Sequence, residues 1–158
     1  MIEPNKREDV TLKVENEILY QLDSLDDLIF IPTKNVYWLE CSKDYQLYCK
    51  HLIACNQKPK TLDMWQSICE ENISYCGLIL NGEMVARAAV ERYSPTKWET
   101  ADVRVVHNER NKGYAKQVVY FVTKYILENN RLATCRTLDS NVAMKNVIHS
   151  IGFQETKN

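Results

Sequence analysis

Hydrophobic and polar residues in the second half of the chain follow two alternating spacings. From Ala115 to Ile126 apolar side chains recur every three or four residues, which predicts a helix with one buried face. The β-rich run 131–138 (RLATCRTL) predicts a strand after it. A further helix is expected to begin at Asn141 and to end at Gly152. Its buried stripe is expected to contain Met144, Val147, Ile148 and Ile151.

Three strands are predicted before this region. The dipeptide Asn81-Gly82 separates the runs 76–80 and 83–92, and it predicts a β-hairpin because a type I′ turn needs a positive φ at both central residues. A third antiparallel strand is expected from Trp98 to Val106. Regular alternation would place one set of side chains on one face of that strand and the other set opposite. The sets are Glu99, Ala101, Val103 and Val105, and Trp98, Thr100, Asp102 and Arg104.

The part of the chain before the hairpin predicts one strand and two helices. The strand is expected from Val36 to Cys41. Apolar residues from 47 to 55 predict the first helix, with Ser42 as its N-cap, and Thr61 is expected to cap the second. Residues of the second helix expected to point inward are Leu62, Trp65, Ile68 and Cys69. His51 lies within the first apolar stripe, so we expect a packed and hydrogen-bonded histidine rather than a ligand.

Residues 1–35 carry weaker signals. Alternating apolar residues from Val10 to Val14 indicate one strand, residues 17–22 indicate another, and residues 25–29 indicate a short helical turn. We therefore expect an N-terminal extension, 1–35, that is part of the same domain or of an interface, followed by a main domain, 36–158.

Composition restricts the classes of protein that the chain could represent. A length of 158 residues with 45% hydrophobic residues suits one domain, and a net charge of −1 argues against a general nucleic-acid-binding surface. No membrane span and no signal-peptide core are expected. The six cysteines include no C-x-x-C pair, so we expect reduced, buried thiols in a cytoplasmic protein, with no metal site.

A short basic loop lies between the third strand and the helix that begins near Ala115. Backbone N–H groups at a helix N-terminus bind phosphate well, and Gly113 allows a close backbone approach or a positive φ. Arg110, Gly113 and Ala115 match the pattern [QR]-x-x-G-x-[GA], and Asn141, Gly152 and Phe153 match N-x(10)-G-F. With the flanking elements, these motifs resemble the GNAT superfamily of acetyl-CoA-dependent N-acetyltransferases.

The resemblance implies an α+β fold of GNAT type, with a mixed, mainly antiparallel sheet and helices on both faces. It implies acetyl transfer from acetyl-CoA (coenzyme A) to a primary amine of a small molecule or peptide, by direct attack in a ternary complex. Residues expected to bind the cofactor are Val103, Arg104, Val105, Arg110, Asn111, Lys112, Gly113, Tyr114, Ala115, Lys116 and Asn141. Asn141 could equally be a plain N-cap.

Glu99 is the expected general base. It stands eleven residues before Arg110, as the base does in the histone-acetyltransferase branch of the family. A face shared with Ala101, Val103 and Val105 would raise its pKa by partial desolvation. A solvent-exposed carboxylate at a strand end is the alternative. Asp102, Glu91 and His107 are the next candidates.

Two departures from the family pattern affect the expected function. The family's usual general acid, a tyrosine seven residues after the asparagine, is replaced by Ile148. The family also continues past the glycine-phenylalanine pair with two strands, whereas residues 154–158 are too few for both, so the extension 1–35 or a second subunit in a homodimer is expected to cover that sheet edge. The alternative function is therefore a catalytically silent acyl-CoA-binding module of the same fold, and a structural domain without a ligand is a third.

Overall fold

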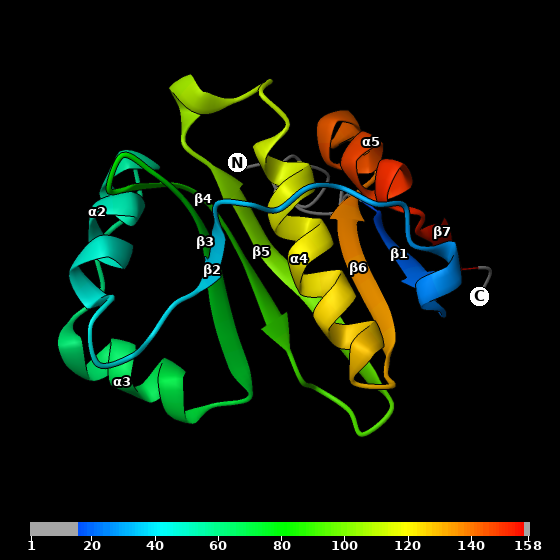
Figure 1. The fold of residues 1–158 in the computed structure, drawn as a ribbon, viewed down its shortest axis with the longest axis horizontal. Helices are drawn as coiled ribbons and strands as arrows, with labels where there is room; N and C mark the ends of the chain where they lie inside the picture. The colour runs from blue at the N-terminus through cyan, green and yellow to red at the C-terminus, as the bar shows by residue number, and fades with distance from the viewer. Residues whose placement is uncertain (1–15, 157–158) are drawn as a thin grey trace, which may run out of the picture.

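A seven-stranded mixed sheet forms the centre of the protein (Figure 1). The structure, a computed structural model, describes residues 16–156. Its strands are β1 (Glu17–Leu22), β2 (Val36–Trp38), β3 (Ile73–Leu80), β4 (Glu83–Glu91), β5 (Lys97–Val105), β6 (Leu132–Leu138) and β7 (Gln154–Glu155). Its helices are η1 (Leu25–Asp27), α2 (Tyr45–Ala54), α3 (Leu62–Glu70), η2 (His107–Glu109), α4 (Tyr114–Glu128) and α5 (Val142–Ile151). The predicted α+β class and the predicted mainly antiparallel sheet are confirmed.

The strand order is β2-β3-β4-β5-β6-β1-β7, and every pair except β5 with β6 is antiparallel. The predicted hairpin joins β3 and β4, and both of its turn residues have a positive φ, 52° at Asn81 and 78° at Gly82. The parallel pairing of β5 with β6 is short, because it joins only residues 97–99 to residues 132–134. Both strands continue beyond these residues, so the sheet opens between them.

Strand β1 covers the far edge of β6 over its whole length, from Glu17 opposite Leu138 to Leu22 opposite Ala133. Tyr20 and Leu22 in this strand are almost fully buried, so hydrophobic burial as well as pairing holds it in place. The short strand β7 pairs in turn with β1. The sequence left two possibilities for covering this edge, the N-terminal extension or a second subunit. In the structure a strand of the extension, β1, lies there. The strand predicted at Val10–Val14 lies outside the described residues.

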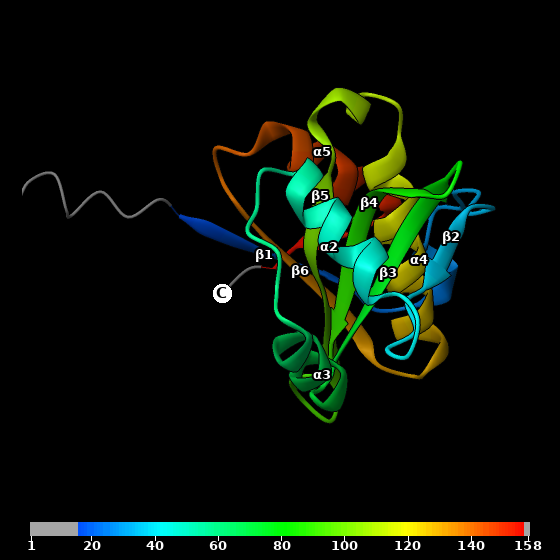
Figure 2. The same ribbon diagram turned by 90° about the vertical axis from the view of Figure 1, so that its left-hand side faces the viewer.

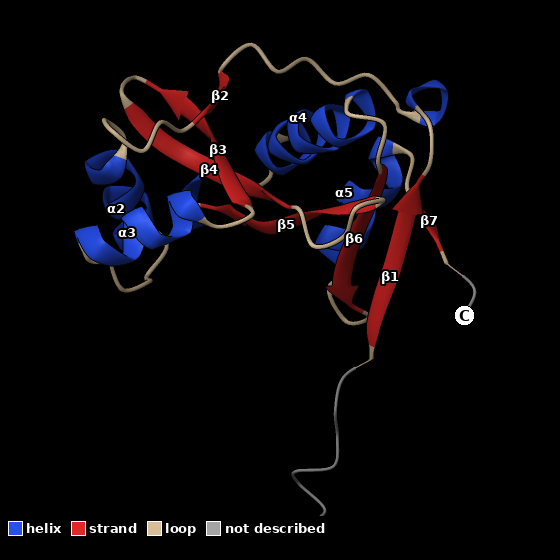
Figure 3. Cartoon of the chain, turned by 90° about the horizontal axis from the view of Figure 1, so that it is seen from below, coloured by secondary structure: helices blue, strands red, loops and turns tan. Residues whose placement is uncertain are grey.

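Helices cover both faces of the sheet, as the views in Figures 2 and 3 show. α4 and α5 pack against each other and against the main core, which contains residues from β1, β4 and β6. α2 and α3 lie on the opposite face over β3 and β4, where Tyr48, Leu52, Trp65 and Met84 form a second, smaller core. Two cores of unequal size therefore lie on the two sides of the sheet.

Local capping chemistry agrees with the sequence at three of four helix ends. Thr61 accepts a hydrogen bond from the backbone of Met64, Asn141 caps α5, and Gly152 ends it with a φ of 115°. The prediction of Ser42 as the N-cap of α2 was wrong. Asp44 holds that position and its carboxylate accepts from the N–H of Glu40, which folds the preceding loop back.

Three further expectations need correction. Leu62 is 49% exposed, because it lies in the first turn of α3, beyond the edge of the small core. Strand β2 ends at Trp38, earlier than predicted. Cys41 and Cys69 form a disulfide, with a Cα–Cα distance of 6.2 Å, so the prediction that every cysteine is reduced was wrong. Both cysteines lie beside Trp65, whose Nε1 donates to the Cys41 carbonyl at 3.0 Å, so tertiary packing brings them together.

Candidate functional site

The opening between β5 and β6 leads into a cavity of about 570 Å³. Because the two strands are parallel, the segments that follow them, 106–113 after β5 and 139–141 after β6, lie toward the same end of the sheet. The cavity wall also includes Glu17 from β1, so the N-terminal strand contributes to the site. The lining residues are Glu17, Glu91, Tyr93, Glu99, Thr100, Ala101, Asp102, Val103, Cys135, Arg136, Thr137, Asn141 and Met144.

The loop after β5 leaves the N-terminus of α4 without a side-chain cap. Gly113 occupies the N-cap position with a φ of 81°, and Asn111 two residues earlier has a φ of 65°. Beyond its two chain neighbours, no described residue has an atom within 4 Å of the position that a Cβ of Gly113 would occupy. The glycine therefore provides the left-handed backbone and leaves open space. An uncapped, positively polarised helix end beside open space is suited to bind an anion.

The basic side chains of this loop differ in their surroundings. Lys112 is paired with Glu109, Nζ to Oε2, at 2.8 Å, and this hydrogen bond raises its pKa. Arg110 is exposed, and its Nε lies 3.5 Å from the carbonyl oxygen of Val105, which ties the loop to the end of β5. Arg104 is exposed and Lys116 is half-buried on the first turn of α4. The stretch 110–116 is therefore a basic segment at the start of α4.

Glu99 lies on the wall of the cavity at the last residue of the β5–β6 pairing. Its side chain is 17% exposed and accepts a hydrogen bond from Nε of Arg136 at 3.0 Å. Burial raises the pKa of Glu99 above its usual range, although the Arg136 guanidinium acts in the opposite direction. Glu91 lies directly across from it on β4. The site thus contains a half-buried carboxylate that is harder to ionise than one in water.

The predicted side-chain alternation of β5 is wrong beyond Ala101, because the strand contains a β-bulge. The register passes from Ala89 opposite Ala101 to Arg87 opposite Arg104, and Asp102 takes a φ of 48°. Val103 and Val105 consequently pack against the main core. Asp102 instead points to the face covered by α2 and α3. The raised pKa of Glu99 therefore comes from its own burial and not from a face shared with the two valines.

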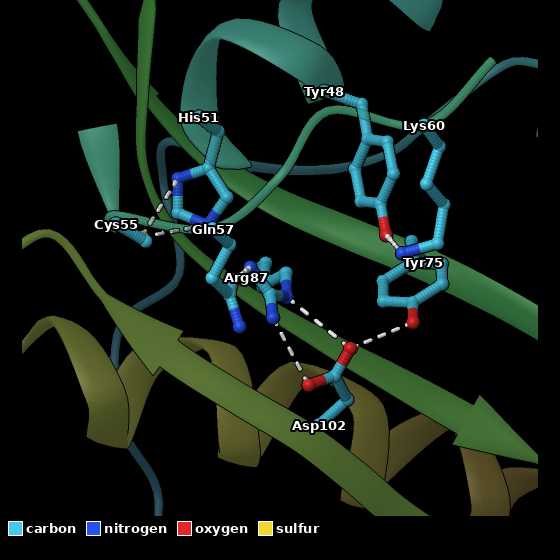
Figure 4. A network of polar contacts seen from close by, with 8 residues as sticks. All are labelled: Tyr48, His51, Cys55, Gln57, Lys60, Tyr75, Arg87 and Asp102. Atoms are coloured by element: carbon cyan, nitrogen blue, oxygen red, sulfur yellow. Dashed lines mark hydrogen bonds and ion pairs between the residues drawn. The ribbon is translucent and has the colours of Figure 1, made fainter. Parts of the chain in front are cut away.

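A polar network holds this bulge, and Figure 4 shows its members converging beneath α2. Both oxygens of the Asp102 carboxylate accept from Arg87, at 3.3 Å from Nε and 3.1 Å from Nη2, and Tyr75 donates its hydroxyl at 2.7 Å. Nη1 of Arg87 also donates to Gln57. His51 in the same region is buried, and its Nδ1 lies 2.9 Å from the Met84 carbonyl, which confirms the predicted packed histidine. Burial lowers the pKa of His51 to about 4, so it is neutral.

The position of the expected general acid is held by a side chain that cannot donate a proton. Ile148 is fully buried in the main core, and His149 packs its ring against Tyr20, with 5.4 Å between centroids. Asn141 both lines the cavity and caps α5, accepting from the Met144 N–H at 3.1 Å, so its side-chain oxygen is already engaged. Tyr93, which follows β4, is the tyrosine among the lining residues, and its hydroxyl lies 3.0 Å from that of Thr134.

Several lining residues were not predicted from the sequence, chiefly Glu17, Tyr93 and Arg136. Arg87 could have been found, since a charged arginine inside the apolar run of β4 needs a hydrogen-bond acceptor of opposite charge nearby. Of the other proposed bases, Glu91 and Asp102 line the cavity, whereas His107 is exposed in η2 and does not. In the described part of the chain no group of three or more histidine, cysteine, aspartate or glutamate residues could hold a metal ion. No helix between residues 16 and 156 is long and apolar enough to cross a membrane.

Solved structures share this fold. A candidate GNAT acetyltransferase from Novosphingobium aromaticivorans is 16% identical, with a TM-score of 0.72. The match covers 92% of this chain and 62% of the other protein's chain. A GNAT-family acetyltransferase from Colwellia psychrerythraea is 19% identical with a TM-score of 0.74, covering 90% of this chain and 53% of its own. The chain therefore spans between half and two thirds of these two proteins.

A third structure is AAC(6')-Iy in complex with a bisubstrate analog, CoA-S-monomethyl-acetylneamine. It is 14% identical with a TM-score of 0.65 and covers 78% of this chain and 92% of its own. No curated protein matches the sequence. The family model of the acetyltransferase (GNAT) family matches residues 33–153, which is most of the chain. The protein therefore belongs to the GNAT family of acetyltransferases.

Proposed function

We propose that this protein is an N-acetyltransferase that transfers the acetyl group of acetyl-CoA to a primary amine of a small molecule or peptide. The observation that carries the proposal is the cavity at the opening between β5 and β6, with a half-buried glutamate on its wall and an uncapped helix end beside it. The three features correspond to the needs of the reaction, which are a place for the thioester, a base and an anion site.

The donor would bind across the open end of the sheet. The backbone of Val103, Arg104 and Val105 lies beyond the β5–β6 pairing and would bind the pantetheine arm as an added strand would. The N–H groups at the start of α4 and the basic residues 110–116 would hold the pyrophosphate. Asn141 would contribute an amide N–H, since its oxygen already caps α5. The AAC(6')-Iy complex supports this assignment, because a protein of the same fold holds a CoA conjugate.

The acceptor would enter as an ammonium ion. The described lining residues include four carboxylates, Glu17, Glu91, Glu99 and Asp102, and one guanidinium, Arg136, a balance that favours a cation. Glu99 would take one proton, directly or through water, and the neutral nitrogen would then attack the thioester carbonyl carbon. As the tetrahedral intermediate collapses, the carbon–sulfur bond breaks and the CoA thiolate leaves. The second proton on nitrogen goes to that thiolate, so the products are the acetamide and CoA.

Direct attack is favoured over an acyl-enzyme intermediate. Cys135 is the cysteine in the cavity wall and so the candidate nucleophile, but its side chain is almost fully buried. Burial raises the pKa of the Cys135 thiol to about 12, so the reactive thiolate would be scarce near neutral pH. The amine therefore has to meet the thioester itself, which requires both substrates in the site together.

The second candidate function is a catalytically silent acyl-CoA-binding module, and the buried Ile148 at the position of the family's acid favours it. The CoA thiolate is a tolerable leaving group near neutral pH, so the missing acid is compatible with turnover. Two further expectations stay as proposals, a cytoplasmic location, where acetyl-CoA would be available, and assembly as a homodimer.

Two measurements on the purified protein test these functions. Release of the CoA thiol from acetyl-CoA across a panel of primary amines should show turnover with a cationic acceptor. Titration with CoA separates the remaining possibilities. Binding without turnover on any amine would favour the silent module, and the absence of binding at millimolar CoA would contradict both functions.

A further inference from the structure

The β-bulge of β5 carries an unusual backbone at a residue that is not glycine. Asp102 has a φ of 48°, a left-handed conformation that L-residues avoid unless the surroundings hold them in it. Two residues of β5, Asp102 and Val103, face the single residue Ala88 of β4 at this point. The bulge lies beyond the last β5–β6 pair, at Glu99, and just before Arg104 and Val105, which pair with β4 but not with β6. Its conformation therefore sets the direction of the strand at these two residues.

The side chain of Asp102 is fixed by three hydrogen bonds from two residues, a group that we call the Asp102 clamp. Arg87 donates twice and Tyr75 once, and the Arg87 side chain is only 2% exposed. Burial raises the pKa of Tyr75, with the Asp102 carboxylate adding to the effect, so Tyr75 stays a hydrogen-bond donor at neutral pH. Among the described residues, a buried guanidinium that lost this carboxylate would keep one side-chain partner, Gln57. The clamp is therefore costly to break.

We propose that Asp102 is a positioning residue, and that the Asp102 clamp holds the bulge so that the backbone of β5 meets the acyl-thioester donor in a fixed orientation. This inference rests on the proposed function. It also changes the assignment of Asp102, which the sequence made a reserve base. A carboxylate that accepts hydrogen bonds from Arg87 and Tyr75 on both oxygens is poorly placed to take a proton from an amine.

Three substitutions separate the two roles of Asp102. Asp102→Ala removes the clamp and disfavours the left-handed backbone. Asp102→Gly removes the clamp but fits the backbone, and Asp102→Asn keeps a hydrogen-bonding side chain that tolerates a positive φ. As a matched control, Leu22→Ala lowers stability from the buried core of β1 without touching the clamp. Each variant is examined for folding by circular dichroism, for acetyl-CoA affinity by calorimetric titration and for kcat and KM with an active amine.

We expect Asp102→Ala to weaken acetyl-CoA binding by about tenfold or more and to raise the KM for the donor. Asp102→Asn should lose less affinity than Asp102→Ala and keep a kcat near that of the wild type. It tolerates the positive φ and its amide oxygen still accepts from Arg87, whereas its amide nitrogen cannot accept the remaining hydrogen bonds. Asp102→Gly should lie between them, and Leu22→Ala should melt earlier but bind acetyl-CoA normally.

Two results would overturn the inference. One is a folded Asp102→Ala protein that binds acetyl-CoA as the wild type does. The other is an Asp102→Asn protein with normal affinity, a kcat reduced by about a hundredfold or more and a changed pH profile, which would make Asp102 a base. If Asp102→Ala does not fold, equal affinities of the Gly and Asn variants would overturn it. A wild-type protein that does not bind acetyl-CoA would instead overturn the proposed function and this inference together.

Discussion

Replacing Glu99 by glutamine is the most direct test of the proposed chemistry. The two side chains have the same shape, and the glutamine oxygen can still accept from Arg136, which lies 3.0 Å from the present carboxylate. The substitution therefore removes the ability to accept a proton and preserves the cavity wall. Loss of a positioned general base lowers the rate by about 10²- to 10⁴-fold, so kcat should fall by at least two orders of magnitude. Acetyl-CoA affinity should be nearly unchanged, because Glu99 lies outside the loop 110–116.

The pH dependence of the wild type follows from the direction of the pKa shift. Burial raises the pKa of Glu99 above its ordinary value of 4.5, and only the ionised form can take a proton. The rate should therefore rise with pH through that raised pKa, and the glutamine variant should lack this rise. The apparent pKa in a profile of kcat/KM is that of the free enzyme. The apparent pKa in a profile of kcat is that of the complex with both substrates.

The same shift predicts a small effect on stability. A raised pKa in the folded state means that the folded protein binds this proton more tightly than the unfolded chain does. The contribution to stability is complete below pH 4.5 and is lost as the pH rises through the folded value. At neutral pH glutamine thus removes an unfavourably buried charge, while the weakened contact with the half-exposed Arg136 costs about 0–1 kcal/mol. The free energy of unfolding should change by less than about 1 kcal/mol.

Thiol release from acetyl-CoA with a saturating amine measures the turnover of each variant. Glu128→Gln, an exposed carboxylate near the end of α4, is the surface control and should behave as the wild type. Glu91→Gln removes a charge from the same cavity opposite Glu99, so it should raise the KM of a cationic amine more than it lowers kcat. A Glu99→Gln enzyme with the wild-type rate and pH profile would refute the reasoning. So would a Glu91→Gln enzyme that showed the large loss of kcat instead.

Three other predictions concern the donor site and the sheet edge. Acetyl-CoA at a hundred times its dissociation constant should stabilise the fold by about 2.7 kcal/mol, and an unchanged melting temperature at millimolar ligand would contradict the donor site. Gly113→Glu should abolish CoA binding in a folded protein, because it places a negative charge and a strained φ at the uncapped end of α4; normal affinity would move the phosphate site elsewhere. Deleting residues 1–24 should lower stability by several kcal/mol or change the oligomeric state, because β1 contributes two buried side chains and covers the edge of β6; an unchanged melting temperature and mass would show that the segment is dispensable.

Periodicity predicted the helices, the hairpin and most strands of this fold, because each depends on contacts between near neighbours in the sequence. The side-chain alternation of β5 was predicted only as far as Ala101. A β-bulge does not change the spacing of apolar residues in the sequence, so the spacing cannot predict it. The residue that indicates this bulge is Arg87 on β4, whose buried charge needs Asp102 as a partner. Reading β5 alone therefore placed Val103, Val105 and the Asp102 carboxylate on the wrong faces.

The candidate site likewise contains features that local sequence predicts and features that depend on tertiary contacts. The loop around Gly113 and the capping role of Asn141 follow from local motifs, and the sequence predicted both. Glu17 and Arg136 could not be predicted, because Glu17 joins the cavity only after β1 pairs with β6, and Arg136 meets Glu99 only after β6 pairs with β5. The Cys41–Cys69 disulfide was missed for a similar reason, since helix α3 has to pack beside the loop before α2 to bring the two cysteines together.

The pairing of β1 with β6 also has a consequence for the order in which the molecule forms. Glu17 meets Leu138, so these neighbours in the sheet are separated by roughly 120 residues, and closing such a long loop is slow and entropically costly. During synthesis β1 leaves the ribosome long before its partner β6. Until β6 is made, the apolar residues Tyr20 and Leu22 stay exposed to solvent. The hairpin of β3 and β4 can form early from local contacts. The acidic wall that Glu17 completes is therefore expected among the last parts of the protein to assemble.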